Sequence, residues 1–297
     1  MPTFLTSHTA GEDATLVQGL EHAVPARWDN TPAPVTDSLD ARVARFRVSP
    51  GLLDVLIAAR LNAPDSIRKS MSVGGDVQRY FWIVAPGAAR TYRNNGPVDT
   101  AGVYTWSQRV ESANLVYRVE EFGATASRAG RATGALEANA TSFPPLGFGI
   151  SDVLLATRVT APGGTARRWS DLRIAPLAGP IASGGMLSVV WESYEMGSQD
   201  GQAHYDVSIT IEREASAAGR VAARIADALA SVVRVQTATD RVVNAFERTV
   251  AHGPALVDHI TLALDKTPAG SYTLALAITD LVTGKKATRV THFAIRE

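Results

Sequence analysis

The chain has 297 residues, enough for two domains that each bury a hydrophobic core. Its 29 basic and 29 acidic side chains give a net charge of zero, which removes the basic excess that a nucleic-acid-binding protein needs. Because the chain contains no cysteine, disulfides, thiolate metal sites, cysteine nucleophiles and iron–sulfur clusters are excluded.

Neither a membrane span nor a signal peptide is visible. No stretch approaches the roughly 18 consecutive apolar residues of a transmembrane helix, and we expect no direct membrane span. The first residues, MPTFLTSHTAGEDATLVQ, lack the basic and apolar regions of a signal peptide. Two compartments stay open: the cytoplasm, or the periplasm and cell envelope if this sequence lacks its export signal.

Residues 1–40 are predicted to form an extended polar leader. Pro25, Pro32 and Pro34 interrupt any long helix, although residues 13–22 can form a short one. A leader without its own core frays unless something packs against it. We therefore expect it to dock either on the body of the protein or on a partner.

Residues 41–138 are predicted to form a first β-sandwich. Residues 55–61 are a near-continuous apolar run, and residues 80–84 and 115–120 alternate between two faces with the period of a strand. Clusters of Gly, Asn and Pro separate these runs. Several short strands with turn signals between them are typical of an immunoglobulin-like sandwich.

Residues 139–147 (NATSFPPLG) have the composition of a linker, and residues 148–297 are predicted to form a second sandwich. Its expected strands lie at 153–159, 187–194 and 205–211, the last with Tyr205 and every second residue after it pointing inward. The fold class is therefore mostly β, with two tandem immunoglobulin-like β-sandwiches.

One segment breaks the β pattern. Between residues 216 and 235, Val221, Ile225, Leu229 and Val232 recur at spacings of three and four. This spacing predicts an amphipathic helix inserted in the second sandwich, with Ser216 as its N-cap. It is expected to cover one end or face of the sandwich; binding a partner is the alternative.

Residues 256–295 show the clearest strand pattern in the chain. Tyr272, Leu274, Leu276 and Ile278 alternate with small or polar residues, the period of a half-buried strand. Turn residues precede this strand at 268–270 and follow it at 283–285. The segment is expected to form three strands joined by two turns, which close the second sandwich.

Candidate catalytic and metal-binding patterns are weak. Ser66 and Lys69 match the S-x-x-K pattern of penicillin-recognising enzymes, but the S-D-N and K-T-G elements are absent. His259 and His292 are expected on the outer face of the final sheet, where strand pairing would have to bring them together, with Asp258, to bind a metal. Neither pattern is favoured over an ordinary structural role.

Two pairs of carboxylates and one pair of glycines also resemble known functional patterns. Glu120–Glu121 and Glu192/Glu195 resemble the paired acids of glycosidases. Glu120 and Glu121 are adjacent in a strand and so point to opposite faces, and solvated strand edges are the ordinary explanation. Gly147 and Gly149 begin a G-x-G-x-x-G loop, but its third glycine is missing.

Three tryptophans bear on ligand binding. Trp82, Trp106 and Trp191 lie within strand patterns and are expected in the core. A carbohydrate-binding surface would instead require them to be exposed together on one sheet face. We therefore predict no catalytic, cofactor-binding or metal-binding residue, and no cofactor.

The second half resembles the C-terminal β-sandwich region of GWxTD-domain proteins. The resemblance rests on FGISDVLLA at 148–156, VVWESYE at 189–195, RVAARI at 220–225, FER at 246–248, PAGSYTL at 268–274, TDLVTG at 279–284, and Phe293. It covers residues 146–297, and the GWxTD motif itself is absent. The family occurs in Gemmatimonadota and related bacteria, and the resemblance implies a β-sandwich scaffold at the cell envelope.

These observations lead to one expected function and one alternative. The expected function is a non-catalytic structural or interaction subunit of a bacterial envelope or membrane-associated complex, with other protein subunits, including membrane proteins, as partners and no nucleic acid. Because some Gemmatimonadota are phototrophic, the resemblance extends this to a membrane-extrinsic subunit bracing a photosynthetic complex. The alternative is a sandwich module that binds a carbohydrate or peptide ligand.

Overall fold

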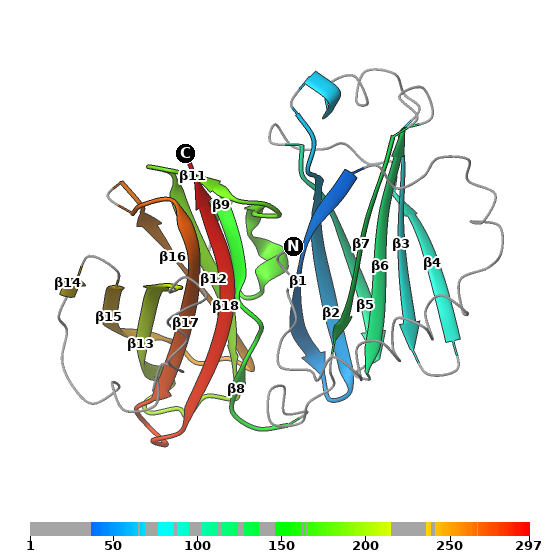
Figure 1. Ribbon diagram of the computed structural model, residues 1–297. Coiled ribbons are helices and arrows are strands. Elements are labelled where there is room, and N and C mark those ends of the chain that lie inside the picture. The colour runs from blue at the N-terminus through cyan, green and yellow to red at the C-terminus, as the bar shows by residue number, and fades with distance from the viewer. Residues whose placement is uncertain are drawn as a thin grey trace. The chain divides into compact units, whose positions relative to one another are not determined.

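The described part of the chain folds almost entirely into β-strands, as a computed structural model shows (Figure 1). The structure describes residues 37–64, 66–68, 77–85, 88–94, 102–111, 114–123, 128–136, 146–161, 163, 166–214, 236–238, 241–265 and 267–297. It divides into two compact units, Met1–Ser142 and Phe143–Glu297.

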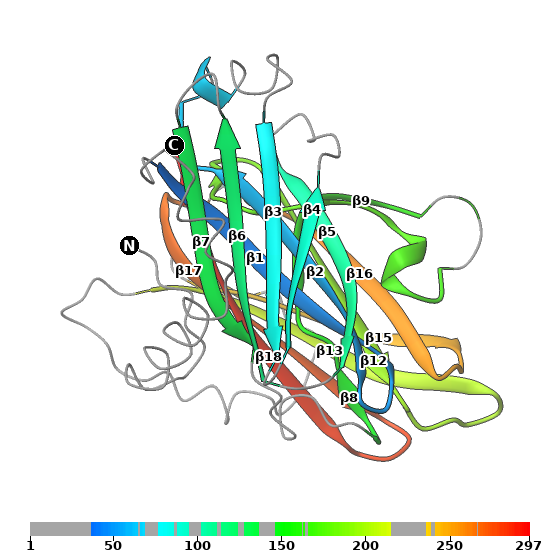
Figure 2. The same ribbon diagram turned by 90° about the vertical axis from the view of Figure 1, so that its right-hand side faces the viewer.

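Among its described residues, the first unit has seven strands in one hydrogen-bonded path. They are β1 (Asp37–Ser49), β2 (Leu52–Leu61), β3 (Val77–Ala85), β4 (Ala88–Asn94), β5 (Tyr104–Glu111), β6 (Leu115–Gly123) and β7 (Arg128–Leu136). Their order is β4-β3-β6-β7-β1-β2-β5. Neighbours pair antiparallel except β1 and β7, which meet over two parallel residue pairs at the start of β1. Figure 2 shows β4, β3, β6 and β7 side by side.

The path of the first unit folds back on itself around a core. The ring of Phe81 on β3 stacks on Trp106 of β5 at 5.6 Å, and Tyr104 meets Trp106 edge-on at 4.9 Å. Because β3 and β5 lie near opposite ends of the strand order, these contacts show that two layers face each other. Tyr117 and Val119 of β6 are also buried.

The second unit has two sheets. Its strands are β8 (Gly149–Ile150), β9 (Leu154–Thr160), β10 (Arg173–Pro176), β11 (Ile181–Ala182), β12 (Met186–Tyr194), β13 (Gln202–Arg213), β14 (Gln236–Ala238), β15 (Arg241–Ala251), β16 (Ala255–Ala263), β17 (Gly270–Asp280) and β18 (Lys286–Arg296), with a 3₁₀ turn η2 (Trp169–Asp171). The five-stranded sheet has the order β10-β9-β12-β16, with β8 also paired to β12. The six-stranded sheet has the order β11-β18-β17-β13-β15-β14.

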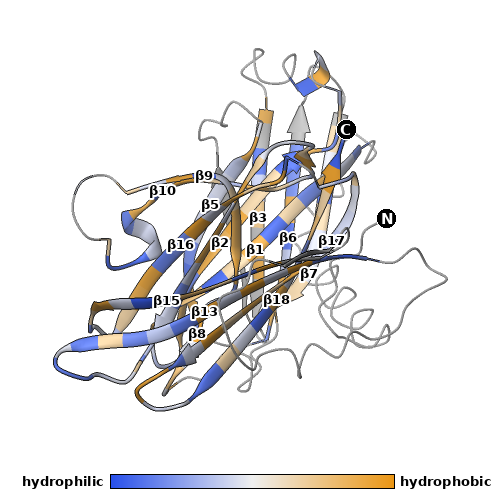
Figure 3. Cartoon of the chain, turned by 90° about the vertical axis from the view of Figure 1, so that its left-hand side faces the viewer, coloured by the Kyte–Doolittle hydropathy of each residue, from blue (hydrophilic) through white to orange (hydrophobic). Residues whose placement is uncertain are grey.

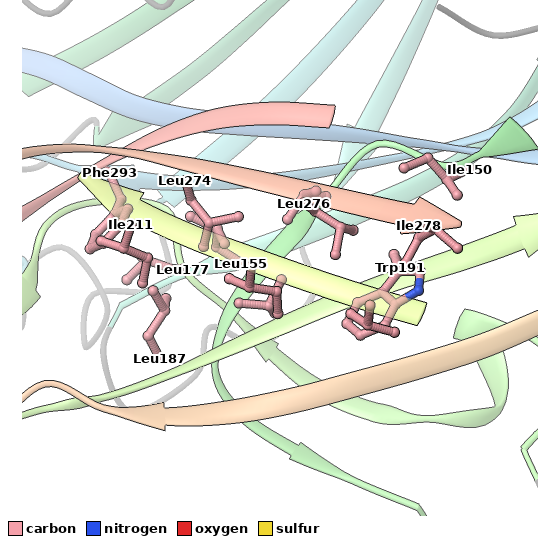
Figure 4. Packing of buried hydrophobic residues seen from close by; sticks show 14 of the residues in the cluster. Ile150, Leu155, Leu177, Leu187, Trp191, Ile211, Leu274, Leu276, Ile278 and Phe293 are labelled. Carbon is pink, nitrogen blue, oxygen red and sulfur yellow. The ribbon is translucent and has the colours of Figure 1, made fainter. Parts of the chain in front are cut away.

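One hydrophobic core lies between these two sheets (Figure 4). Leu155 and Trp191 reach it from the five-stranded sheet, and Ile211, Leu274 and Leu276 from the six-stranded sheet. Each of these side chains is at most 2% exposed. Since fully burying such a side chain contributes about 1.5–3 kcal/mol, this core is the main stabilising feature of the unit. Figure 3 shows hydrophobic and hydrophilic residues interspersed along the strands.

The mostly β fold class is confirmed, and so are several strand assignments. The runs at 55–61, 153–159, 187–194 and 205–211 fall on β2, β9, β12 and β13. Tyr205 and the alternate residues after it are buried, as the period of two predicted. The immunoglobulin-like type and the count of two sandwiches stay predictions. The helix at 216–235 lies outside the described residues, and β1 begins at Asp37, inside the predicted 1–40 leader.

The segment 256–295 differs from its prediction in one respect. It contains three strands, β16, β17 and β18, but only β17 and β18 pair with each other. β16 pairs with β12 in the other sheet. The connection at residues 264–269 therefore crosses between sheets, because the apolar faces of β16 and β17 both contribute to the core that lies between them.

Candidate functional site

A buried polar site in the second unit surrounds Glu192, on β12. Its side chain is fully buried, with 0% exposed. Oε1 accepts hydrogen bonds from Arg168 Nε at 2.8 Å and from the backbone N–H of Trp169 at 2.7 Å, and Oε2 accepts from the Tyr194 hydroxyl at 3.0 Å. Both carboxylate oxygens thus have donors, and one of the donors is charged, as a buried charge requires.

The segment that Glu192 holds is itself ordered by a second acid. Oδ2 of Asp171 accepts the backbone N–H groups of Arg167 at 2.8 Å and Arg168 at 3.0 Å. These two backbone hydrogen bonds lower the pKa of Asp171 below its ordinary value. The turn η2 is therefore closed at its start by Asp171 and attached to β12 by Glu192.

A backbone pair and a serine complete the surroundings of Glu192. The N–H of Ser151 donates to the Glu192 carbonyl at 2.8 Å, and the N–H of Glu192 donates to Ser151 Oγ at 2.9 Å. Glu192 is consequently fixed at its backbone as well as at its carboxylate. The whole arrangement clamps the segments before β9 and around η2 to the central strand of the sheet.

Asp280 forms a comparable clamp at the end of β17. Its Oδ1 accepts the N–H groups of Val282 and Thr283 at 3.0 and 3.3 Å, and its Oδ2 accepts Thr283 Oγ1 at 2.6 Å and the N–H of Gly197 at 2.7 Å. Burial raises the pKa of Asp280, but these hydrogen bonds outweigh burial and lower it. The residue joins the β17–β18 turn to the loop that follows β12.

The first unit contains a buried ion pair of a different kind. Arg79 on β3 and Glu121 on β6 lie opposite each other, with Nη2 and Oε1 separated by 3.4 Å, and both are less than a tenth exposed. The Arg79 guanidinium lies over the ring of Tyr104 at 4.9 Å. Burial raises the pKa of Glu121, against the opposing effect of Arg79, and raises that of the Tyr104 hydroxyl.

Such a perturbed carboxyl is a common mark of an active site. Here its partners are the arginine and tyrosine of its own core, and Arg68 adds a further positive charge nearby. We therefore assign Arg79 and Glu121 a structural role.

The third constellation is exposed on the six-stranded sheet and resembles a nucleophile with its base. Glu214 Oε1 lies 2.8 Å from Nδ1 of His292, and Thr273 Oγ1 lies 3.2 Å from both of these atoms. A catalytic triad requires the nucleophile and the carboxylate to bind opposite ring nitrogens. Because both groups converge on Nδ1, this geometry cannot relay a proton from Thr273 to Glu214.

The predicted histidine pair is separated by the fold. His259 lies on β16 in the five-stranded sheet and His292 on β18 in the six-stranded sheet, so the prediction that both lie in one final sheet is wrong. The reason is the sheet crossing at residues 264–269. Within the described residues, no group of three or more His, Cys, Asp or Glu side chains is arranged to hold a metal ion.

The two carboxylate pairs do not act together. Glu121 binds Arg79, whereas Glu120 binds Arg131 from the opposite face of β6. Both glutamates are less than a tenth exposed, so the interpretation as solvated strand edges is wrong; arginines on neighbouring strands compensate their burial. Glu192 is engaged as described, and Glu195 instead accepts the N–H of Gly147 at 2.7 Å.

The remaining candidates from the sequence have local roles or lie outside the residues that the structure describes. Ser66 is exposed, and Lys69 lies outside the described residues. Gly147 has a φ of +86°, and Gly149 opens the two-residue strand β8. Of the tryptophans, Trp106 is 9% and Trp191 0% exposed, while the side chain of Trp82 is outside the described set.

Sequence reasoning missed the η2 clamp and the Glu214–His292 contact. The first depends on a tertiary hydrogen bond between residues 23 positions apart, which no local pattern shows. The second follows from the register of β17 and β18, in which Thr273 lies opposite His292. In the part of the chain that the structure describes, no helix is long and apolar enough to cross a membrane.

Comparison with known proteins identifies no family. No protein-family model matches the chain, and no curated protein matches it. Among solved structures, a red sea bream transglutaminase is 10% identical over 89% of this chain and 32% of its own, with a TM-score of 0.24.

Two further solved structures give the same TM-score. Trypsin-activated alpha-2-macroglobulin from Escherichia coli is 11% identical over 87% of this chain and 18% of its own, with a TM-score of 0.24. The FN1–FN3 domains of chicken CNTN1 are 12% identical over 90% and 69%, also with a TM-score of 0.24. The chain spans less than a third of the length of the first two, and similarity at this level carries no argument about activity.

Proposed function

We propose that this protein is a non-catalytic structural or interaction subunit of a bacterial envelope or membrane-associated complex. One observation carries the proposal: the acids buried in the second unit hold its own loops in place. Glu192 fixes the η2 segment and Asp280 fixes the β17–β18 turn, each with donors on both carboxylate oxygens. These groups therefore strengthen the frame of the unit, which on this proposal carries the surface for assembly.

The setting of this subunit rests on the sequence resemblance to GWxTD-domain proteins. It favours the periplasm or cell envelope over the cytoplasm, and membrane proteins or their extrinsic subunits as partners. Bracing a photosynthetic complex is the most specific form of the proposal. The net charge of zero supports protein partners over nucleic acid.

The alternative, a carbohydrate-binding module, is weakened by the tryptophans. Such a module needs an exposed row of aromatic side chains, and Trp106 and Trp191 both lie in cores. A peptide ligand does not need that row and stays the stronger form of the alternative.

Affinity purification from the protein's own cells tests the proposal. The tagged chain, solubilised in mild detergent, should co-purify with other polypeptides at a fixed ratio, and membrane proteins should be among them. A Glu192→Ala variant, in which the frame is loosened, should lose part of this association, whereas Glu195→Ala should retain it. A chain that purifies with no other polypeptide would overturn the proposal.

A further inference from the structure

β16 is an edge strand whose outer side has no partner in the described structure. It pairs with β12 on one side only and ends the strand order of the five-stranded sheet. Two hydrogen bonds extend the same ladder at its ends, Glu195 N–H to the Pro254 carbonyl and Leu264 N–H to the Gly185 carbonyl. In an antiparallel ladder every second residue pair is hydrogen-bonded.

These two end bonds determine which residues of β16 face outward. The backbone groups of every second residue of β16 are hydrogen-bonded to β12; these residues are Leu256, Asp258, Ile260 and Leu262. The backbone groups of the alternate residues point away from β12; they are Ala255, Val257, His259, Thr261 and Ala263. Of these outward groups, only the N–H of His259 has a partner among the described residues, Asp258 Oδ1 at 2.8 Å.

The composition of this edge does not oppose pairing. Natural edge strands are protected by Lys, by Pro or by other charges. Residues 255–263 contain no Lys, Arg, Glu or Pro. Their single charge, Asp258, is engaged by Arg248 Nε and the Tyr205 hydroxyl, each at 3.1 Å. By contrast, β15, which lies next to the last strand β14 of the other sheet, carries Glu247 and Arg248.

The outward residues of β16 are also symmetric about His259. Val257 and Thr261 flank it and have the same branched shape, and Ala255 and Ala263 lie beyond them. In an antiparallel pair of identical strands centred on His259, each outward residue therefore meets its equivalent in size. On the other face, Leu256 meets Leu262 of the second copy, while Asp258 meets Ile260.

We propose that β16 pairs antiparallel with β16 of a second copy, across a two-fold axis through His259. The two five-stranded sheets become one continuous sheet, joined by about ten hydrogen bonds, two for each of the five outward pairs. The His259 N–H exchanges Asp258 for the His259 carbonyl of the second copy. The chain's net charge of zero gives the two copies no overall repulsion. This inference goes beyond the proposed function, because the partner is the same chain.

The mass of the purified full chain tests this pairing. In sedimentation velocity over rising concentration, it should approach twice the 31.5 kDa of one chain. Val257→Pro removes an outward N–H that makes no bond in the described structure, a change that edge strands tolerate, and should yield monomers. Val257→Thr keeps both the N–H and the shape, and should dimerise like the parent.

A disulfide test does not depend on how well the proline variant folds. Because the chain has no cysteine, His259→Cys introduces a single thiol that lies opposite itself in the proposed dimer. A hydrogen-bonded antiparallel pair has Cα atoms about 5.5 Å apart, within the range for a disulfide. The Ala263→Cys thiol instead lies opposite Ala255. Mild oxidation should therefore link His259→Cys into dimers and leave Ala263→Cys largely unlinked.

Three results would overturn the inference. They are a monomer at every concentration, a dimer that survives Val257→Pro, and equal linking of the two cysteine variants. If another protein or a segment of the same chain fills this edge, the isolated chain gives the first result. The proposed function is unaffected by such a failure, since co-purification with other polypeptides is measured separately.

Discussion

Replacing Glu192 tests whether the buried acid holds the second unit together. Glu192→Ala removes the carboxylate that accepts hydrogen bonds from the Trp169 N–H and the Tyr194 hydroxyl; Tyr194 is only 3% exposed. Each buried group that loses its partner costs about 1–3 kcal/mol. Arg168, with 29% of its side chain exposed, can turn to water and adds less. We expect a loss of about 3–5 kcal/mol, the range for breaking a buried ion pair from one side.

The conservative variant Glu192→Gln should lose less free energy of unfolding than Glu192→Ala and more than the control variant. Glu192→Gln keeps the size and one acceptor oxygen but loses the charge, so its hydrogen bonds weaken from the charged range of about 1.5–3 kcal/mol to the neutral range of about 0.5–1.5 kcal/mol. The matched control is Glu195→Ala. That carboxylate is exposed and accepts the Gly147 N–H, so its removal should cost at most about 1 kcal/mol.

Hydrogen exchange with mass spectrometry measures this effect without assuming that two units unfold together. Peptides covering residues 166–172 and 186–194 should exchange faster in Glu192→Ala than in the parent and in Glu195→Ala. Peptides from the first unit should be unchanged. If the exchange of 166–172 in Glu192→Ala matched that in Glu195→Ala, the clamp would not exist as described.

Three further predictions concern the same unit. Hydrogen bonds lower the pKa of Asp280 in the folded state. Its contribution to stability is therefore present above the unfolded-state pKa of about 3.9 and is lost as the pH falls through the lower folded-state pKa. Urea unfolding from pH 6 to pH 2 should show this loss of stability in the parent and not in Asp280→Asn. Gly197→Ala should destabilise by about 1–3 kcal/mol, since the new Cβ would lie 2.7 Å from Val282 Cβ; Gly253→Ala, with no atom nearer than 3.5 Å, is its control, and equal urea midpoints would contradict the prediction. Tyr272→Phe should cost about 0.5–1.5 kcal/mol in urea unfolding, because it removes the 2.7 Å hydrogen bond to the Pro268 carbonyl and keeps the ring stacked on Phe293; no measurable loss would refute it.

Alternating patterns predicted the strands because burial of one face of a strand requires apolar residues at every second position of the sequence. Tyr205 to Ile211 and Tyr272 to Ile278 show this, since the side chains predicted inward are all buried. The pairing of β16 was not predictable in this way, because its pattern fits either sheet. The choice of partner depends on the connection at residues 264–269 and on the complete core.

The buried charges escaped prediction for a related reason. Glu120 and Glu121 resemble solvated residues in sequence, and only the placement of Arg131 and Arg79 on neighbouring strands permits their burial. Glu192 likewise depends on η2, which has no periodic pattern of its own. The strands that make up the frame of the unit could be predicted from the sequence. The polar contacts that fix the frame join residues that are distant in the chain.

Intact mass measurement of the assembly purified from the protein's own cells tests the central claim most directly. A scaffolding or interaction subunit should appear in a defined particle with at least one other polypeptide at fixed stoichiometry. That particle should be recovered in lower amount when the second unit is loosened by Glu192→Ala, and in the parent's amount with Glu195→Ala. A chain recovered alone, or only as pairs of itself, would contradict the proposed role in a larger complex.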